Sequence, residues 1–483
     1  MKISEAMGLK KSQLELEFVD YDLDGDTRLF LDPYFISTQN NNFCNQANII
    51  IKNFFNCLLF YLREGKHSKA QEMLIHIGEF KDANLGLSQG KPNGKGIGSF
   101  YSEQLFKSLK KSKAVKTGLV EDIEDLAIFI EGIGRDRMSD MLGNILKKLL
   151  IDYTIEQCNI YGIPLQEAPS GYYWDIETNE WKNTYEKRLI INSKTYVLVP
   201  KFIVCYSVVY TPQNFIQHFA LNFLQDEYLR LGSSLIKYTY DKDGKVKSAE
   251  VTKISIREDF EKHNQALNKD FIFTFALNHA DVLKKFKDEV RDKIVEKEEL
   301  SEADKAIVLR TLIEGFDNIP AGRDYADAYH NWVLGALEVL VYPNLINPKK
   351  EDPINDGRKR IDITFENAAK NGFFFELPTT HQVECNKIMI ECKNYSNDIA
   401  NAELDQMNGR FGSNRGRLGI VCCRSIDDKD LLLKRCVDFS TAQRNYIIVL
   451  TDEDIKATLQ KFIEGDMDAF NKCLRDKFFE LIS

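Results

Sequence analysis

Three residues in the last third of the chain have the types and spacing needed for hydrolytic chemistry. Glu391 and Lys393 are two residues apart in the run Lys387–Tyr395, which is typical of a β-strand ending in polar residues. Both side chains should therefore leave the same face, while Cys392 between them should point into a core. A carboxylate and an ammonium at the end of an apolar strand are costly to bury without a purpose. Asp362 lies 29 residues earlier (391 minus 362), far enough for a hairpin that places it beside Glu391.

Two neighbouring carboxylates repel each other unless a cation lies between them. Mg²⁺ fits this position because it prefers oxygen ligands and keeps several waters, and Mn²⁺ is an alternative ion. Such an ion polarises a phosphoryl oxygen and lowers the pKa of a bound water. Lys393 could orient or activate that water and offset charge in the transition state. The three residues therefore predict metal-assisted hydrolysis of a phosphodiester.

Asp362, a spacer and then Glu391-x-Lys393 resemble the motif of the PD-(D/E)XK nuclease superfamily, which includes many restriction endonucleases. The resemblance covers about residues 320–460. It implies that Asp362 and Glu391 bind the metal and that Lys393 contributes to catalysis. It also implies an acidic ligand on the preceding helix, where Glu338 matches, and a glutamine on the helix after the third strand, where Gln406 matches.

The sequence departs from the superfamily pattern in two ways. Ile361 precedes Asp362 where the superfamily often has proline. The spacer is longer than usual, as if Phe373–Glu384 were inserted. The register of the hairpin therefore stays open, and the alternative ligands are Glu366, Glu376 and Glu384.

The elements that must position these residues alternate between helices and strands. We expect helices at Asp324–Val341, Asn401–Phe411 and Asp427–Thr441, and strands at Arg358–Phe365, Phe373–Leu377, Lys387–Tyr395, Leu418–Cys423 and Tyr446–Thr451. Strands separated by helices imply parallel pairing within a central mixed sheet that is covered on both faces. The predicted fold class is α/β, or α+β mixed overall, with a restriction endonuclease-like core in residues 316–483.

The first two thirds of the chain read as two further regions. Residues 1–165 are predicted to form a mostly helical domain with a recognition or regulatory role, because long segments carry apolar faces at helical spacing. Residues 166–315 are predicted to be a mixed α/β region that serves as a scaffold or interaction module. Within it, the turn Asp241–Gly244 between Leu235–Tyr240 and Lys245–Ile256 predicts a hairpin.

The charge balance limits the class of partner. The 483 residues include 64 Lys and Arg against 73 Asp and Glu, a net charge of −9, which argues against a generally basic, duplex-coating protein. A local positive groove is still allowed, since arginines flank the predicted site and would hold backbone phosphates. These arginines are Arg358, Arg360, Arg410, Arg415 and Arg417.

The composition favours a cytoplasmic protein without a membrane span. No run reaches the roughly 18 uncharged apolar residues that a span needs, and the first residues lack the apolar core of a signal peptide. The ten cysteines include no CxxC pair, so we expect reduced thiols and no structural zinc. His330 and His381 could approach the predicted site, but each is interpreted as a hydrogen-bonded structural residue.

Two other segments partly match ligand-binding loop motifs. Gly86–Gly98 lacks the spacing of a phosphate-binding P-loop and is interpreted as a surface loop or a contact to nucleic acid or a partner. Asp20–Asp26 begins like a calcium loop, but Leu31 stands where the closing Glu is required, so it is interpreted as a solvated acidic turn.

The leading hypothesis is a Mg²⁺-dependent nuclease. The resemblance favours DNA over RNA as substrate, and bacterial restriction or antiphage defence as context, with a further protein of the defence system as partner. Such nucleases often pair subunits to cut both strands, so a homodimer is also expected. The alternatives are a catalytically inactive nuclease fold that binds nucleic acid or acts in assembly, and an RNA-directed nuclease. The cleavage specificity, the activating trigger and the role of residues 1–315 stay open.

Overall fold

The structure is a computed structural model that describes residues 1–27, 29–39, 41–86, 97–120, 122–205, 211–242, 245–292, 302–354, 358–395, 397–412 and 414–482. Two buried apolar cores organise these residues. One draws almost entirely on residues 3–286 and the other on residues 309–481. Most of the Gly86–Gly98 loop and the tip of the Asp241–Gly244 turn lie outside the described residues.

The N-terminal part is mainly helical, as predicted. Its helices are α1 (Ile3–Ala6), α2 (Pro33–Ser37), α3 (Asn42–Arg63), α4 (His67–Leu74), α5 (Ile97–Lys111), α6 (Lys113–Thr117), α7 (Asp125–Phe129), α8 (Arg135–Ile145) and α9 (Lys147–Tyr161). The long helix α3 begins where the side chain of Asn41 accepts a hydrogen bond from the amide of Cys44, which satisfies a free donor of the first turn.

Short strands, one between α1 and α2 and the others after α9, share the core of these helices. They are β1 (Phe30–Leu31), β2 (Gln166–Pro169), β3 (Tyr173–Asp175), β4 (Glu180–Lys182), β5 (Tyr185–Ile191), β6 (Lys194–Tyr196) and β7 (Val204–Cys205). Strand β7 pairs with β1, and the indole of Trp174 donates to Asn53 of α3 at 2.7 Å. Residues 166–205 therefore pack with the N-terminal helices in the first core.

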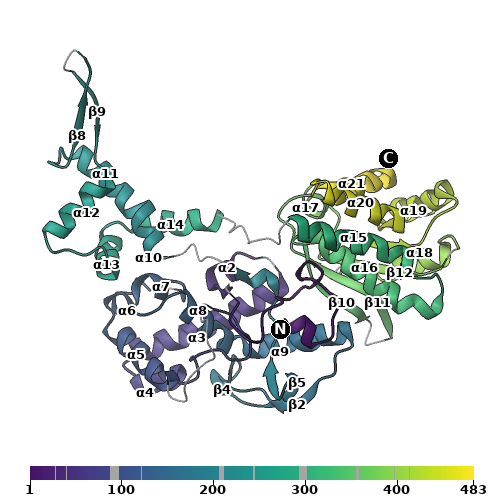
Figure 1. The fold of residues 1–483 in the computed structure, drawn as a ribbon, viewed down its shortest axis with the longest axis horizontal. Coiled ribbons are helices and arrows are strands. Elements are labelled where there is room, and N and C mark those ends of the chain that lie inside the picture. The colour runs from purple at the N-terminus through teal and green to yellow at the C-terminus, as the bar shows by residue number, and fades with distance from the viewer. Residues whose placement is uncertain are drawn as a thin grey trace.

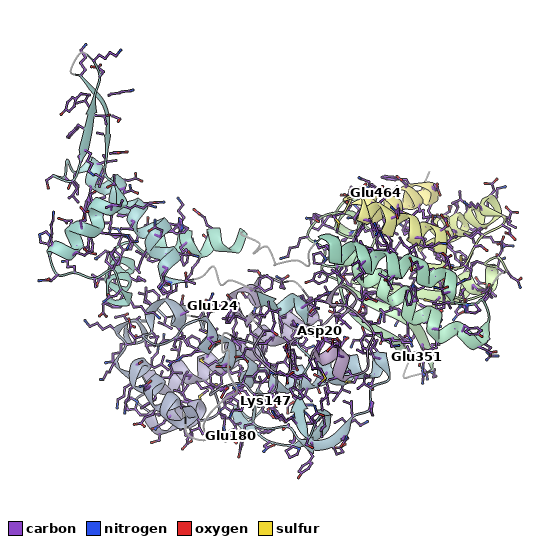
Figure 2. All side chains as sticks on the ribbon, viewed as in Figure 1. Asp20, Glu124, Lys147, Glu180, Glu351 and Glu464 are labelled. Atoms are coloured by element: carbon purple, nitrogen blue, oxygen red, sulfur yellow. The ribbon has the colours of Figure 1, made fainter. Side chains whose placement is uncertain are left out.

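The next helices extend the first core into an arm, whose far end is a two-stranded hairpin that projects away from the rest of the molecule (Figure 1). The arm contains α10 (Pro212–Phe215), α11 (Leu221–Arg230), β8 (Lys237–Tyr240), β9 (Val246–Glu250), α12 (Lys253–Lys262), α13 (Lys269–Asn278) and α14 (Ala280–Asp292). The predicted hairpin is confirmed as the antiparallel pair β8–β9, whose side chains extend outward on both strands (Figure 2). The predicted second strand is too long, because Thr252 caps α12 and places Ile256 in that helix.

The C-terminal part contains the predicted mixed sheet. Its strands run in the order β10 (Leu345–Ile354), β11 (Lys359–Asn367), β12 (Lys387–Lys393), β13 (Leu418–Cys423) and β14 (Tyr446–Thr451). The first three pair antiparallel, and the last three pair parallel. The flanking helices are α15 (Glu302–Asn318), α16 (Ala326–Val341), α17 (Phe373–Thr379), α18 (Asn401–Asn408), α19 (Lys429–Gln443), α20 (Asp452–Ile463) and α21 (Ala469–Ile482).

Two elements of this sheet differ from the prediction. Strand β10 was missed, because Pro348 and Pro353 interrupt its sequence, as is tolerated only on an edge strand. The register of β10 shifts between Ile346 and Lys349. The predicted strand Phe373–Leu377 is wrong, since these residues form most of helix α17.

Helices cover both faces of the sheet and fix its strands. On one face, the hydroxyl of Tyr329 in α16 donates to Asp452 at the start of α20 at 2.8 Å. On the other face, Met407 of α18 packs so closely on Gly419 of β13 that a Cβ there would lie 2.4 Å from its sulfur. From these positions α16 reaches Asp362 of β11 through His330, and α18 reaches Glu391 of β12 through Gln406.

Direct contacts join the two cores. The carboxylate of Glu17 accepts a hydrogen bond from the backbone amide of Asn347 in β10 at 2.9 Å. The carboxylate of Glu366 in β11 accepts one from the backbone amide of Asn42 at 3.1 Å. Lys349 pairs with Glu156 of α9 at 2.7 Å. Within the described part of the chain, no helix has the length and apolar character needed to cross a membrane.

Candidate active site

The two predicted carboxylates meet where the pairing of β11 with β12 ends. The register places Ile363 opposite Ile390, and the next positions hold Asp362 and Glu391. Oδ2 of Asp362 accepts a hydrogen bond from the backbone amide of Cys392 at 2.8 Å. This bond fixes the carboxylate of Asp362 at the opening between the strands, with a quarter of the side chain (25%) exposed.

The carboxylate of Glu391 is fully buried and surrounded by donors. Nε of Arg410 lies 3.3 Å from Oε1, in the loop after α18. Nζ of Lys393 and Nε2 of Gln406 lie 3.4 and 3.1 Å from Oε2. Two cations and an amide therefore hold one buried anion.

The electrostatics of Glu391 reflect this crowding. Burial is the main cause that raises its pKa above the ordinary value, and the neighbouring charge of Asp362 raises it further. Lys393 and Arg410 oppose both effects. A divalent ion between the two carboxylates would relieve their repulsion, and carboxylate oxygens completed by water are the donors that Mg²⁺ prefers. The donor chemistry of Asp362 and Glu391 therefore fits a hard divalent ion.

Lys393 and Gln406 form a fixed pair beside Glu391. Nζ of Lys393 donates to Oε1 of Gln406 at 3.1 Å as well as to Glu391. The structure thus brings together four of the five residues predicted for catalysis, from β11, β12 and α18. The ammonium of Lys393 is held at the open end of the strand, next to the carboxylate of Glu391.

The fifth residue, Glu338, lies elsewhere, which corrects its predicted role as a metal ligand. It is eight residues beyond His330 on α16, about 12 Å along the helix axis. Its charged neighbours are Lys11, Lys201, Glu17 and Glu15 of the N-terminal part. Neither carboxylate oxygen has a hydrogen-bond partner among the described residues. Glu338 is therefore part of the contact between the two cores.

A pH-dependent stability follows from the burial of Glu338. Burial raises its pKa to about 8, with Lys11 and Lys201 lowering it and Glu17 and Glu15 raising it. Because the folded state keeps a proton that the unfolded state loses, this group makes the protein less stable as pH rises from about 4.5 to 8. Glu338→Gln removes this titration. In urea denaturation, the free energy of unfolding of the variant relative to that of the wild type should therefore rise by roughly 3 kcal/mol between pH 5 and pH 8.

The control for this comparison is Glu480→Gln, which changes an exposed carboxylate. Its stability difference from the wild type should be the same at both pH values. Equal differences at pH 5 and pH 8 for Glu338→Gln would contradict the assignment of a buried, protonated carboxyl group.

The three alternative ligands are engaged away from the site. Glu366 accepts from Asn42 and from Asn347 at the contact between the cores. Glu376 forms two hydrogen bonds with Arg475, and Glu384 lies 3.8 Å from Arg417. The long spacer therefore inserts α17 without changing which acid lies opposite Glu391.

The five predicted phosphate-binding arginines divide into two groups. Arg410 is buried against Glu391, and Arg415 donates to the carbonyl of Arg410 at 2.7 Å, so both support the site from inside. The remaining side chains are more exposed: Arg358, Arg360 and Arg417. Arg360 lies two positions before Asp362 on the same strand face, although it also pairs with Glu351 at 2.8 Å.

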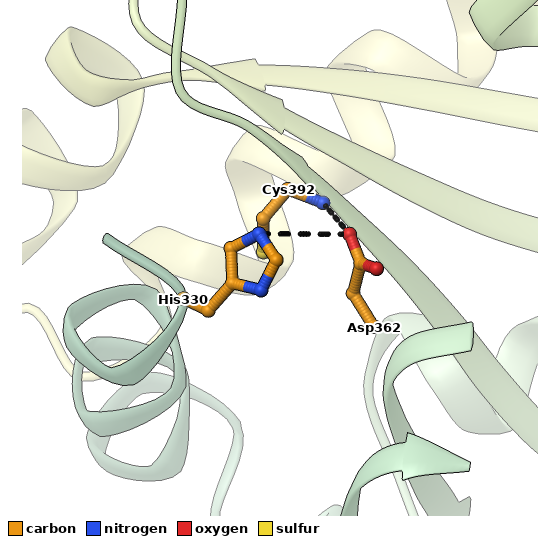
Figure 3. A group of neighbouring side chains, drawn as sticks. All are labelled: His330, Asp362 and Cys392. Atoms are coloured by element: carbon orange, nitrogen blue, oxygen red, sulfur yellow. Dashed lines mark hydrogen bonds and ion pairs between the residues drawn. The ribbon is translucent and has the colours of Figure 1, made fainter. Parts of the chain in front are cut away.

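His330, interpreted above as a structural histidine, lies beside Asp362. Nε2 of His330 in α16 lies 3.8 Å from Oδ2 of Asp362, and the thiol of Cys392 completes the group (Figure 3). The burial of Cys392 raises the pKa of its thiol well above the ordinary value. Because a nucleophilic cysteine needs an accessible thiolate, this thiol is poorly suited to attack a substrate.

The comparisons with known proteins concern the N-terminal part. Residues 8–211 match a family model described as a domain of unknown function, DUF8370. No curated protein and no solved structure matches the chain. The matched segment covers most of the N-terminal helices and their short strands, and it ends before the arm and the C-terminal sheet.

Proposed function

We propose that this protein is a Mg²⁺-dependent nuclease that hydrolyses phosphodiester bonds, with DNA as its preferred substrate. The observation that carries the proposal is the convergence of Asp362, Glu391, Lys393 and Gln406 at the ends of two paired strands. A mixed five-stranded sheet with this site at its centre agrees with the PD-(D/E)XK resemblance. That resemblance also supports the expected setting in bacterial restriction or antiphage defence.

Each residue of the chain has a distinct task in this proposal. Asp362 and Glu391 would hold the ion, which when bound supplies charge stabilisation at the phosphoryl group and a more acidic water. Lys393 places an ammonium beside them, where it orients the attacking water and offsets negative charge in the transition state. Gln406 keeps the ammonium in place through its 3.1 Å contact. Arg358 and Arg360 supply exposed positive charge on the same side for phosphate contacts.

One contact favours the alternative of a nuclease fold that binds nucleic acid without cutting it. The guanidinium of Arg410 already neutralises the buried Glu391 at 3.3 Å, in the place where an ion would act. An inactive protein could keep this pair as a purely structural feature. An RNA-directed nuclease would use the same residues as the DNA enzyme.

The test is digestion of duplex DNA, single-stranded DNA and RNA by the full-length chain with Mg²⁺, with Mn²⁺ and with EDTA. We expect DNA cleavage with either ion and none with EDTA. Cleavage of RNA alone would replace the substrate assignment. Binding without cleavage of any substrate would support the inactive alternative and remove the proposed enzyme activity.

A further inference from the structure

A second group of metal-binding side chains lies on the other side of Asp362. One ligand atom each from His330, Asp362 and Cys392 lies within 4.8 Å of the other two. The three residues come from α16, β11 and β12, and their side chains point toward one another (Figure 3). Because Cys392 alternates with Glu391 along β12, its thiol lies on the opposite strand face from the Glu391 carboxylate.

The chemistry of this group differs from that of the hard-ion site. Imidazole nitrogen, thiolate sulfur and carboxylate oxygen are the three ligand types of zinc, at about 2.0 to 2.3 Å from the ion. Two such ligands in tetrahedral geometry are roughly 3.5 Å apart, and the 3.8 Å between His330 and Asp362 is close to that spacing. Mg²⁺ avoids sulfur and nitrogen ligands.

We propose that His330, Asp362 and Cys392 form a site for a borderline-soft divalent ion such as Zn²⁺. Three protein ligands leave a fourth position for water, as in zinc sites that stay open. The ion would enter beside His330 and Asp362, whose side chains are 18% and 25% exposed, whereas Cys392 is buried behind them. Binding replaces the thiol proton with the ion and releases that proton to solvent.

The backbone supports this arrangement. The amide of Cys392 donates to Oδ2 of Asp362, so the same residue that supplies the thiol also fixes the carboxylate. Hydrogen bonds of this kind orient metal ligands and strengthen binding. The group therefore needs only a small contraction of its side chains to close around an ion.

The site has a consequence for the reaction, and this part rests on the proposed function. Asp362 belongs to both groups, facing Glu391 for a hard ion and His330 with Cys392 for a softer one. An ion bound on the His330 side would draw the carboxylate away from Glu391. Zn²⁺ should therefore inhibit cleavage that Mg²⁺ supports, by competing for one carboxylate.

The experiment is a titration of the metal-free, full-length chain with Co²⁺ alone, followed by absorption spectroscopy. We expect a thiolate-to-Co²⁺ charge-transfer band, which is lost in Cys392→Ser and requires at least ~10-fold more Co²⁺ in His330→Ala. Cys436→Ser is the matched control, because Cys436 is also buried but lies on α19, and it should keep the band. Circular dichroism checks that each variant is folded.

Two results would overturn the site. One is the absence of a thiolate band in the wild type, and the other is a band that persists in Cys392→Ser. The inhibition by Zn²⁺ is tested separately. For each variant, the rate of Mg²⁺-supported cleavage with Zn²⁺ is divided by the rate without Zn²⁺. This ratio should be closer to one in His330→Ala than in the wild type. Because the cobalt band does not depend on cleavage, an inactive protein that shows the band would keep this site and lose only the proposed nuclease.

Discussion

Replacing Lys393 with alanine is expected to lower the rate of Mg²⁺-dependent DNA cleavage at least ~10²-fold, because the variant loses a positioned proton-transfer and charge-stabilising group. Asp362→Asn should cause a loss of similar or larger size, since it removes one of the two carboxylates that would hold the ion. Both losses should appear in single-turnover cleavage with saturating enzyme. Asparagine can still accept the Cys392 amide, so the strand ends should keep their structure.

The matched controls lie on the same sheet, away from the site. Lys387→Ala changes a lysine at the opposite end of β12, which lies 3.8 Å from Asp352. Asp352→Asn changes an acid on β10 that accepts from Thr364. Both controls should cleave at close to the wild-type rate. Wild-type rates in Lys393→Ala and Asp362→Asn would assign the cleavage to another site or to a contaminant.

Replacing Arg410 with methionine is expected to destabilise the protein by about 3 kcal/mol, because a buried Glu391 loses its closest guanidinium while its own charge stays buried. The loss should be larger at pH 8 than at pH 5. Arg410 lowers the pKa of Glu391, so its contribution is present where the carboxylate is ionised and fades as pH falls and the carboxylate gains a proton. Urea denaturation at the two pH values measures the difference.

A double-mutant cycle separates the ion pair from the loss of packing. Glu391→Gln combined with Arg410→Met should be less destabilised than the sum of the two single variants. The control is Arg360→Met, whose pair with Glu351 is exposed on both sides and should contribute at most about 0.5 kcal/mol. Strict additivity at Arg410 and Glu391 would show that the guanidinium acts only through packing.

Most of the C-terminal sheet could be predicted from the sequence, because its central strands are continuous apolar runs. Leu418–Cys423 and Tyr446–Thr451 are buried at every position, as parallel strands covered on both faces must be. The run Lys387–Lys393 has the same character until its last residues, where Glu391 and Lys393 interrupt it. This interruption is the feature that identified the candidate site.

The edge of the sheet could not be predicted in this way. Strand β10 contains two prolines and several charged residues, a composition that normally indicates a loop. Its hydrogen-bonded partner β11 makes it a strand, which is a tertiary effect. The strand predicted at Phe373–Leu377 is wrong for a different reason. A short apolar run is compatible with either a strand or a helix.

The sequence predicts the helix Asp324–Val341, but it does not determine which of its side chains faces the candidate site. Both Glu338 and His330 lie on the predicted helix, and the choice between them depends on which face meets the strand ends. Glu338 faces the N-terminal core, where Lys11 and Lys201 are its charged neighbours. This long-range contact cannot be predicted from the sequence around Glu338. The sequence predicts that Arg410 contacts backbone phosphates, yet its side chain is buried against Glu391 at 3.3 Å.

The contacts of Asn347, Lys349 and Glu366 with the N-terminal core affect how two copies of the chain could assemble. These residues lie on the outer two strands, where unpaired amides and carbonyls would otherwise invite another strand. Glu17 and Glu156 of the N-terminal core contact this edge of the sheet at Asn347 and Lys349. A second subunit that extended the sheet by strand addition at β10 would first have to separate the two cores.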